Sequence, residues 1–171
     1  MPTNLMLTKP GNICGLSMIA IPALLRSNQG KSTTPPTLNT LAQQWQTLYN
    51  AGKAQNPPIA AVTASSFLYL AWAVRSQGAA ASSQFAGQSS NTGLFYCGAA
   101  LLTLGVVPWT LVAMMSTNHR LESIAGSGDG AGASVSDEEF DGLVKKWQGF
   151  NLIRGLFPFA GGILGLVVAL C

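Results

Sequence analysis

Three polar or aromatic residues share one face of the helix predicted for the last apolar segment and the residues just before it. Trp147, Asn151 and Arg154 are spaced i, i+4 and i+7, so a helix places all three on one side. A charged group within an apolar segment is costly, and it marks a functional site by default. A guanidinium in this position can stabilise a negatively charged oxygen. The alternative is that Arg154 reaches from the first helical turns to the lipid headgroups.

A second polar set closes the preceding apolar segment. Four residues fall within about 100° of one another on a helix: Thr110, Met114, Thr117 and Asn118. His119 follows at the end of the segment, and histidine is the side chain best suited to act as a base at neutral pH. Each residue also has a structural alternative. The Thr110 hydroxyl can bond to its own helix, Asn118 can cap that helix, and His119 can be a polar surface residue without a task.

Composition restricts the class of protein to which these residues belong. Only 15 of the 171 residues are charged, nine Lys or Arg and six Asp or Glu, where a soluble domain would carry about 43. Hydrophobic residues make up 48% and the mean hydropathy is +0.32, which excludes a disordered chain. The thinly spread net charge of +3 provides no basic stripe, so we expect no nucleic-acid partner. A small membrane protein or a very apolar soluble domain remains.

The residues that usually hold metals or form disulfides are scarce. The three cysteines, Cys14, Cys97 and Cys171, are too far apart for a CxxC knuckle and too few for a disulfide framework. A single histidine excludes every two-histidine metal site. The acidic run at residues 137–141 is more typical of a solvated helix start than of a metal site, although the sequence leaves a metal held by carboxylates open.

Four apolar segments predict an all-α fold, a four-helix transmembrane bundle in one membrane domain that covers residues 1–171. A spanning helix needs about 20 mostly apolar residues. The predicted spans are residues 10–26, 57–75, 94–116 and 150–171. The first is the shortest and could be the core of a signal peptide, but no convincing cleavage site follows it.

The segments between the spans differ in character. Residues 38–53 place Leu41, Trp45, Leu48 and Tyr49 on one helical face, which predicts an amphipathic helix lying at the membrane interface. Residues 123–135 are rich in Gly, Ala and Ser and predict a flexible linker. The sequence from Ser136 to Glu139 is a capping box, which predicts a helix that continues into the last span.

The positive charges predict the orientation and bring the candidate residues together. The loops at 27–57 and 116–149, together with Arg26 just before the first of them, carry six Lys or Arg residues against two on the other side, so we expect both loops to be cytoplasmic. We expect the endoplasmic reticulum or another internal membrane. Several candidates would then surround one pocket mouth: Lys53, Asn118, His119, Arg154, Trp45, Tyr49 and Trp147. Such an aromatic, cationic site suits a flat, phenolic, acidic molecule.

Four motifs carry a resemblance to a known family. They are W-x-x-x-Y-x-x-G-K at 45–53, P-x-T at 108–110, M-x-x-T-N-x-x-L at 114–121 and W-x-x-x-N-x-x-R at 147–154. In this order and spacing, residues 41–171 resemble the fungal anthrone oxygenases, a family of small four-span membrane proteins. The resemblance implies oxidation of an anthrone to an anthraquinone by molecular oxygen in polyketide biosynthesis. The resemblance also implies that the helices contact membrane lipid and that the protein can associate with polyketide pathway enzymes.

The residue inventory is compatible with that activity. An anthrone tautomerises to an electron-rich phenolate that can pass an electron to oxygen, so we expect no cofactor. The chain must then supply a base, donors for the oxyanion and a dry pocket. We assign His119 as the base, with Arg154, Lys53 and Asn118 as oxyanion stabilisers. We assign substrate binding to Lys53 and to six further residues: Trp45, Tyr49, Trp109, Thr110, Trp147 and Asn151. The four aromatic residues among them would stack against the substrate rings.

Three other interpretations stay open on the sequence alone. One keeps the fold and changes the reaction to oxidative decarboxylation, or to oxidation of another phenolic polyketide, in which Arg154 pairs with a substrate carboxylate. A second is a non-catalytic membrane scaffold for a biosynthetic complex, in which Arg154 and Lys53 bind headgroups. A small transporter ranks last, because charges deep within the spans are lacking.

Overall fold

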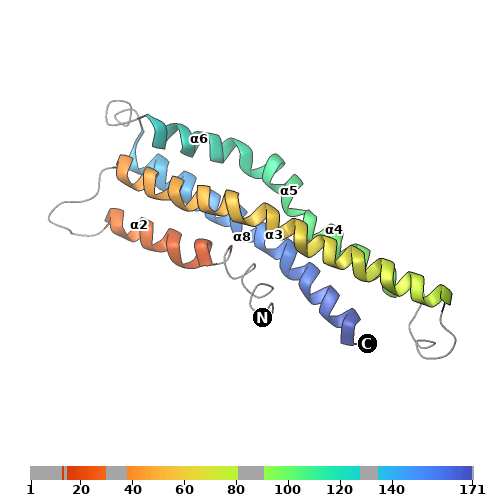
Figure 1. Ribbon diagram of the computed structural model, residues 1–171. Coiled ribbons are helices and arrows are strands. Elements are labelled where there is room, and N and C mark those ends of the chain that lie inside the picture. Colours follow the sequence, from red (N-terminus) through yellow and green to blue (C-terminus); the bar gives the residue numbers. More distant parts are fainter. Residues whose placement is uncertain (1–12, 14, 30–37, 81–90, 128–134, 171) are drawn as a thin grey trace.

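The computed structural model describes residues 13, 15–29, 38–80, 91–127 and 135–170, and these are almost entirely helical, with no β-strand among them (Figure 1). The all-α prediction is therefore confirmed. The helices are η1 (Leu16–Ala20), α2 (Ile21–Gln29), α3 (Leu38–Ala80), α4 (Thr92–Leu104), α5 (Val106–Trp109), η2 (Thr110–Met114), α6 (Met115–Gly126) and α8 (Asp137–Leu170).

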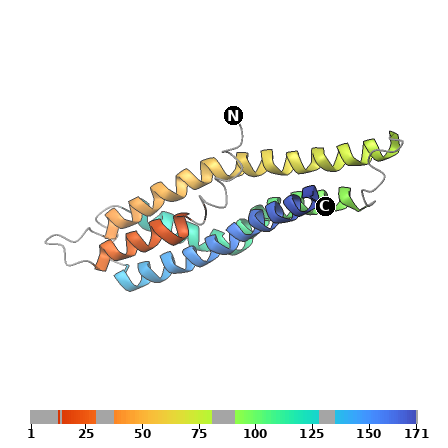
Figure 2. The ribbon, with the colours of Figure 1, turned by 90° about the horizontal axis from the view of Figure 1, so that it is seen from below.

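Three helical rods are long and apolar enough to cross a membrane. They are Leu38–Ser76, Thr92–Gly126 and Asp137–Leu170. In Figure 1, α3 and α8 begin at the same end of the bundle, while the rod formed by α4, α5, η2 and α6 runs the opposite way. The apolar helix before them, Ser17–Arg26, is much shorter, and it lies beside the first part of α3 (Figures 1 and 2). Residues 10–26 are thus not confirmed as a fourth span.

The predicted interfacial helix and the predicted second span are joined in one element, so a separate interfacial helix is not confirmed. Residues 38–53 and 57–75 belong to one helix, α3, which continues through Pro57 and Pro58. A proline lacks the N–H that would bond to the carbonyl four residues earlier, so Lys53 and Ala54 lose these helical bonds. Apolar helices tolerate such losses where neighbouring groups satisfy the carbonyls. The apolar face at Leu41 and Trp45 packs inward, with each residue at most 1% exposed.

Exposed apolar side chains divide the bundle into two halves. On α3 the exposed large hydrophobic residues begin at Val62, on α8 they begin at Leu152, and on the α4–α6 rod they end at Met115. We call the part of the bundle that carries these exposed hydrophobic residues the apolar half. The other part, the polar half, encloses a buried hydrophobic cluster around Trp45, Phe140 and Trp147. A surface of this kind is suited to lipid in one half and to water or headgroups in the other.

Close packing of glycines joins α8 to its neighbours in the apolar half. A Cβ atom built on Gly161 would lie 2.8 Å from both the Ala99 carbonyl oxygen and the Thr103 hydroxyl of α4. One built on Gly165 would overlap the Phe67 ring of α3. The two glycines form a G-x-x-x-G pair, the spacing that lets apolar helices approach closely.

The start of α8 has the predicted cap. The Glu139 backbone N–H donates to the Ser136 hydroxyl at 3.1 Å. The Glu139 carboxylate pairs with Arg120 of α6 instead of bonding back to Ser136, and the shorter of its two N–H···O contacts is 2.8 Å. Residues 123–126 of the predicted linker belong to α6, and residues 128–134 lie outside the described residues. The helix predicted to start at this capping box and to continue into the last span is confirmed, because α8 runs unbroken from Asp137 to Leu170.

Candidate functional site

Aromatic side chains from α3 and α8 meet where the polar half approaches the apolar half. The rings of Trp45 and Tyr49 stack with centroids 5.1 Å apart and planes 9° apart. Trp147 meets Trp45 edge-on at 5.8 Å between centroids. The predicted neighbourhood of these three residues is therefore present, and both tryptophans lie in the bundle core rather than on lipid.

Buried polar atoms without a partner gather on the same faces. Five of them have no hydrogen-bond partner within the part of the chain that the structure describes: Trp45 Nε1, Trp147 Nε1, Arg154 Nε, Asn118 Oδ1 and Asn151 Oδ1. Each unpaired buried donor or acceptor costs about 1–3 kcal/mol. Native structures leave few such groups. Three donors and two acceptors on the inward faces of α3, α6 and α8 therefore predict a polar ligand or ordered water between these helices.

Arg154 lies near the boundary of the two halves. Its guanidinium is partly buried, and it interacts electrostatically with the Tyr49 phenol across the helix interface. Pro158 removes the helical donor that would bond to the Arg154 carbonyl. The Arg154 carbonyl therefore lacks its usual helical donor, and the Arg154 Nε is buried without a partner among the described residues.

Asn118 projects from α6 into the same core. It is 2% exposed, and its helical neighbours Met114 and Leu121 belong to the buried cluster with Trp45 and Trp147. Capping does not explain Asn118, because α6 continues to Gly126. Asn151 is fully buried and is held by the N-terminal segment, since its Nδ2 donates to the Ser17 hydroxyl at 2.7 Å and to the Ile13 carbonyl at 3.2 Å.

Other predicted residues have different surroundings. The His119 side chain is 69% exposed and its Nδ1 lies 3.6 Å from Glu122, so the structure does not bring it to the buried atoms. Lys53 is exposed, with Nζ 5.5 Å from the centre of the Tyr49 ring. The Thr110 hydroxyl donates to the Val106 carbonyl of its own helix at 2.7 Å.

Trp109 contacts α8 from the opposite rod. Its Nε1 donates to the Phe150 carbonyl at 3.1 Å, and its ring lies 6.0 Å from Phe157 between centroids. Trp109 therefore fixes the position of α8 next to Asn151 and Arg154, rather than presenting a free donor.

Asn56 is a candidate that sequence reasoning missed. Both of its amide atoms are buried without a partner among the described residues. It lies four residues after Gly52 and eleven after Trp45, on the inward face of α3. Two contacts between α3 and α8 bracket Asn56: Trp45 meets Trp147 eleven residues before it, and Phe67 meets Gly165 eleven residues after it. Asn56 therefore lies close to the level of Arg154 on α8. The helical spacing from Trp45 and Tyr49 was the available signal.

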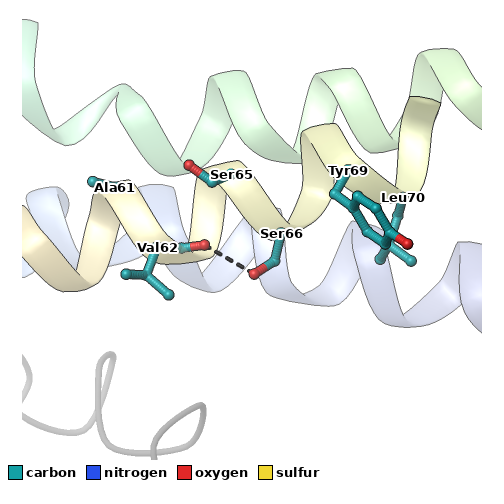
Figure 3. Close-up of a pocket in the computed structure, with 6 residues that line it drawn as sticks. All are labelled: Ala61, Val62, Ser65, Ser66, Tyr69 and Leu70. Atoms are coloured by element: carbon teal, nitrogen blue, oxygen red, sulfur yellow. Dashed lines mark hydrogen bonds between the residues drawn. The ribbon is translucent and has the colours of Figure 1, made fainter. Parts of the chain in front are cut away.

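Neither a metal cluster nor the surface groove on α3 adds a competing site. Within the described ranges, no group of three or more His, Cys, Asp or Glu side chains could hold a metal ion. A groove on α3 is lined by Ala61, Val62, Ser65, Ser66, Tyr69 and Leu70 (Figure 3). The Ser66 hydroxyl donates a hydrogen bond to the Val62 carbonyl at 2.9 Å, within the same helix. This groove is part of the apolar surface and offers no charged group.

Comparison with known proteins decides the family. A family model described as anthrone oxygenase matches residues 45–164, more than half of the chain. The chain belongs to the anthrone oxygenase family. It is similar to anthrone oxygenase encC of Aspergillus fumigatus, with 33% identity over 94% of this chain and 85% of the relative. No solved structure matches it.

Two further relatives agree. The anthrone oxygenase of Claviceps purpurea is 33% identical over 91% of this chain and 78% of its own length. A noranthrone monooxygenase of Aspergillus flavus is 29% identical over 92% of this chain and 66% of its own length. The oxidoreductase class expected from the sequence is therefore confirmed. In this member of the anthrone oxygenase family, the matched region begins at Trp45 and includes Arg154, whereas Ser17 lies outside it.

Proposed function

We propose that this oxidoreductase converts a hydroxylated anthrone of a polyketide pathway to the anthraquinone, using O2, between α3, α6 and α8. The relatives' names supply the substrate class. The observation that supports this site is the group of five unpaired buried polar atoms beside stacked aromatic rings. A flat phenolic ligand matches that group, because its rings stack on tryptophan and its oxygens can pair with both donors and acceptors.

The proposed reaction balances with oxygen as the co-substrate. Removal of one proton from the central methylene gives the anthrolate, which passes one electron to O2. The substrate radical and superoxide then combine at the methylene carbon, and with a proton they give a hydroperoxide. Breaking its O–O bond and the remaining C–H bond releases water and leaves the carbonyl. One anthrone and one O2 thus yield one quinone and one H2O, and the substrate itself supplies the electrons. No flavin, haem or metal is needed for this route.

The chain's residues have distinct proposed roles. Arg154 Nε, together with the indole N–H groups of Trp45 and Trp147, donates to the oxygen that becomes negative when the methylene loses its proton. Asn118 presents its amide oxygen, so we propose that it accepts a substrate hydroxyl rather than stabilising the oxyanion. Lys53 stays a candidate at the pocket mouth through its contact with Tyr49.

His119→Ala tests the predicted base. Because the imidazole is exposed and pairs with Glu122, we expect His119→Ala to retain kcat/KM for the anthrone within about threefold, with water as the proton acceptor. Initial rates of quinone formation check this. A loss of 100-fold or more, the usual contribution of a base, would restore His119 to that role.

Asn56→Leu tests the deep part of the pocket. Replacing an unpaired buried amide by an apolar group is nearly neutral or stabilising, so we expect an unchanged or higher unfolding temperature. Because the amide would no longer bind substrate, KM should rise about tenfold, the effect of one lost hydrogen bond. Asn50→Leu, at an exposed position of the same helix, is the control. An unchanged KM in Asn56→Leu would remove Asn56 from the pocket.

The distribution of positive charges supports a site that opens to the cytoplasm, and we propose an internal membrane as its location. The polar half contains Lys53, Arg120, Lys145 and Lys146, whereas Arg75 lies near the opposite end of α3 (Figure 1). The positive-inside rule then directs the polar half to the cytoplasm. A substrate dissolved in the bilayer would meet the pocket near the boundary of the two halves.

Turnover in air tests the function. Detergent-solubilised protein is mixed with a peri-hydroxylated anthrone, and quinone absorbance is followed against a protein-free blank. We expect clear acceleration over the blank. Folded protein that leaves the rate at the blank value would contradict the proposal and favour a non-catalytic scaffold.

A further inference from the structure

The N-terminal helix contacts α8 beside the candidate site. Asn151 Nδ2 donates to the Ser17 hydroxyl at 2.7 Å and to the Ile13 carbonyl at 3.2 Å. One turn earlier on α8, Gln148 Nε2 donates to the Ser17 carbonyl at 2.7 Å. Ser17 is 1% exposed, and the two bonds of Asn151 are buried, whereas the bond of Gln148 is partly buried. They join residues more than 130 positions apart in the chain.

This network fixes which way the Asn151 amide faces. The two ends of an amide are nearly alike in shape, and their assignment depends on the surrounding hydrogen bonds. The Ile13 carbonyl can only accept, so the NH2 group of Asn151 must face the N-terminal segment. Its Oδ1 then points away from that segment, where it is buried without a partner among the residues described.

The free oxygen belongs to the candidate site. Asn151 lies between Trp147 and Arg154 on one face of α8, and both neighbours also carry unpaired buried donors. Oδ1 is an acceptor only. A ligand that pairs with it must therefore bring a donor, such as a phenolic hydroxyl.

We propose that Ser17 is a positioning residue, which holds the Asn151 amide so that Oδ1 accepts a hydrogen bond from a substrate hydroxyl. This inference rests on the proposed function and adds a residue to it. The helix that begins the described chain would thereby be part of the site, although it lies outside the region that the family model matches.

The experiment compares two ligands and a double-variant cycle. The protein is titrated with two oxygen-stable quinones, one with peri-hydroxyl groups and one without, and binding is read from tryptophan fluorescence. Ser17→Ala removes the shorter of the two bonds that hold the Asn151 amide, so that only the 3.2 Å bond to the Ile13 carbonyl remains and the amide is held less firmly. We expect the Kd for the hydroxylated quinone to rise about tenfold, while the Kd for the unsubstituted quinone stays within about twofold. Ser65→Ala, at an exposed position of α3, should bind both as wild type does.

The cycle shows whether Ser17 acts through Asn151. In an Asn151→Ala background, Ser17→Ala should have no further effect, because contacting residues are non-additive. An equal loss for both quinones, or an additive loss in the double variant, would overturn the inference. If Ser17→Ala does not fold, Ser17→Cys replaces the hydroxyl by a weaker acceptor. Wild-type affinity of Ser17→Cys for the hydroxylated quinone would then overturn it.

Failure of the inference is distinguishable from failure of the proposed function. If wild-type protein binds the hydroxylated quinone and accelerates anthrone oxidation, the function holds whatever Ser17 does. If wild-type protein does neither, the proposed function fails first, and this inference fails with it.

Discussion

Arg154→Ala is expected to lower kcat/KM for the anthrone by about 100- to 1,000-fold, the range found when one donor to a developing oxyanion is removed. The physical reason is the position of Arg154 Nε, a buried donor without a partner among the described residues, close to the stacked Tyr49 ring. Because Arg154 Nε is buried, solvent compensates poorly for the loss of this donor to a negative charge. Steady-state rates of quinone formation, corrected for the protein-free reaction, measure the effect.

Two variants make the Arg154 result specific. Arg154→Lys keeps the charge but loses the planar set of donors, so its activity should lie between those of wild type and Arg154→Ala. Arg75→Ala removes an exposed arginine of α3 and should leave kcat/KM unchanged. If Arg154→Ala is folded and turns over like wild type, Arg154 serves only to anchor the chain at the headgroups.

Gly161→Val is expected to cause the largest loss of stability. A Cβ at this position would meet the Ala99 backbone oxygen and the Thr103 hydroxyl at 2.8 Å, and a backbone carbonyl in a helix cannot rotate away. Overpacking of this kind costs about 1–3 kcal/mol. That corresponds to a fall of about 2–12 °C in the unfolding temperature of a chain of this size. Thermal unfolding in detergent, followed by circular dichroism, measures it.

The adjacent glycine provides a matched control. A Cβ atom built on Gly162 would meet nothing within 4 Å, and the residue faces outward. Gly162→Val should therefore unfold within about 2 °C of wild type, because its side chain enters open space. Equal unfolding temperatures for Gly161→Val and Gly162→Val would mean that α4 and α8 do not pack through Gly161.

Helical periodicity correctly predicted that three of the candidate residues share one face of a helix. The i, i+4, i+7 spacing of Trp147, Asn151 and Arg154 placed them on one inward face, because a continuous α8 keeps the 3.6-residue repeat. The same rule explains the position of His119. Its neighbour Asn118 points into the core, and one residue further along a helix lies about 100° away, so His119 is exposed.

Other features could not follow from local patterns. The apolar stripe at Leu41 and Trp45 indicated burial, but periodicity does not say whether lipid or another helix covers it. Here α6 and α8 do. Proline usually interrupts a helix, so local patterns do not reveal that α3 continues through Pro57 and Pro58.

The Ser17–Asn151 bond was not predictable for a different reason. It joins residues 134 positions apart, so it appears only once the N-terminal helix is placed against α8. The unpaired atoms of Asn56 and Asn118 likewise become visible only when the neighbours of each atom are known.

The most direct test of the central claim is a single turnover with ¹⁸O2. Protein stripped of metals by a chelator and dialysis is mixed anaerobically with a peri-hydroxylated anthrone in H2¹⁶O, and a pulse of ¹⁸O2 starts the reaction. The account predicts a quinone that is heavier by one ¹⁸O atom, formed faster than in the protein-free blank and at the same rate with or without stripping. Quinone without the label, or a rate that falls to the blank after stripping and returns with added metal, would contradict a cofactor-free oxygenase.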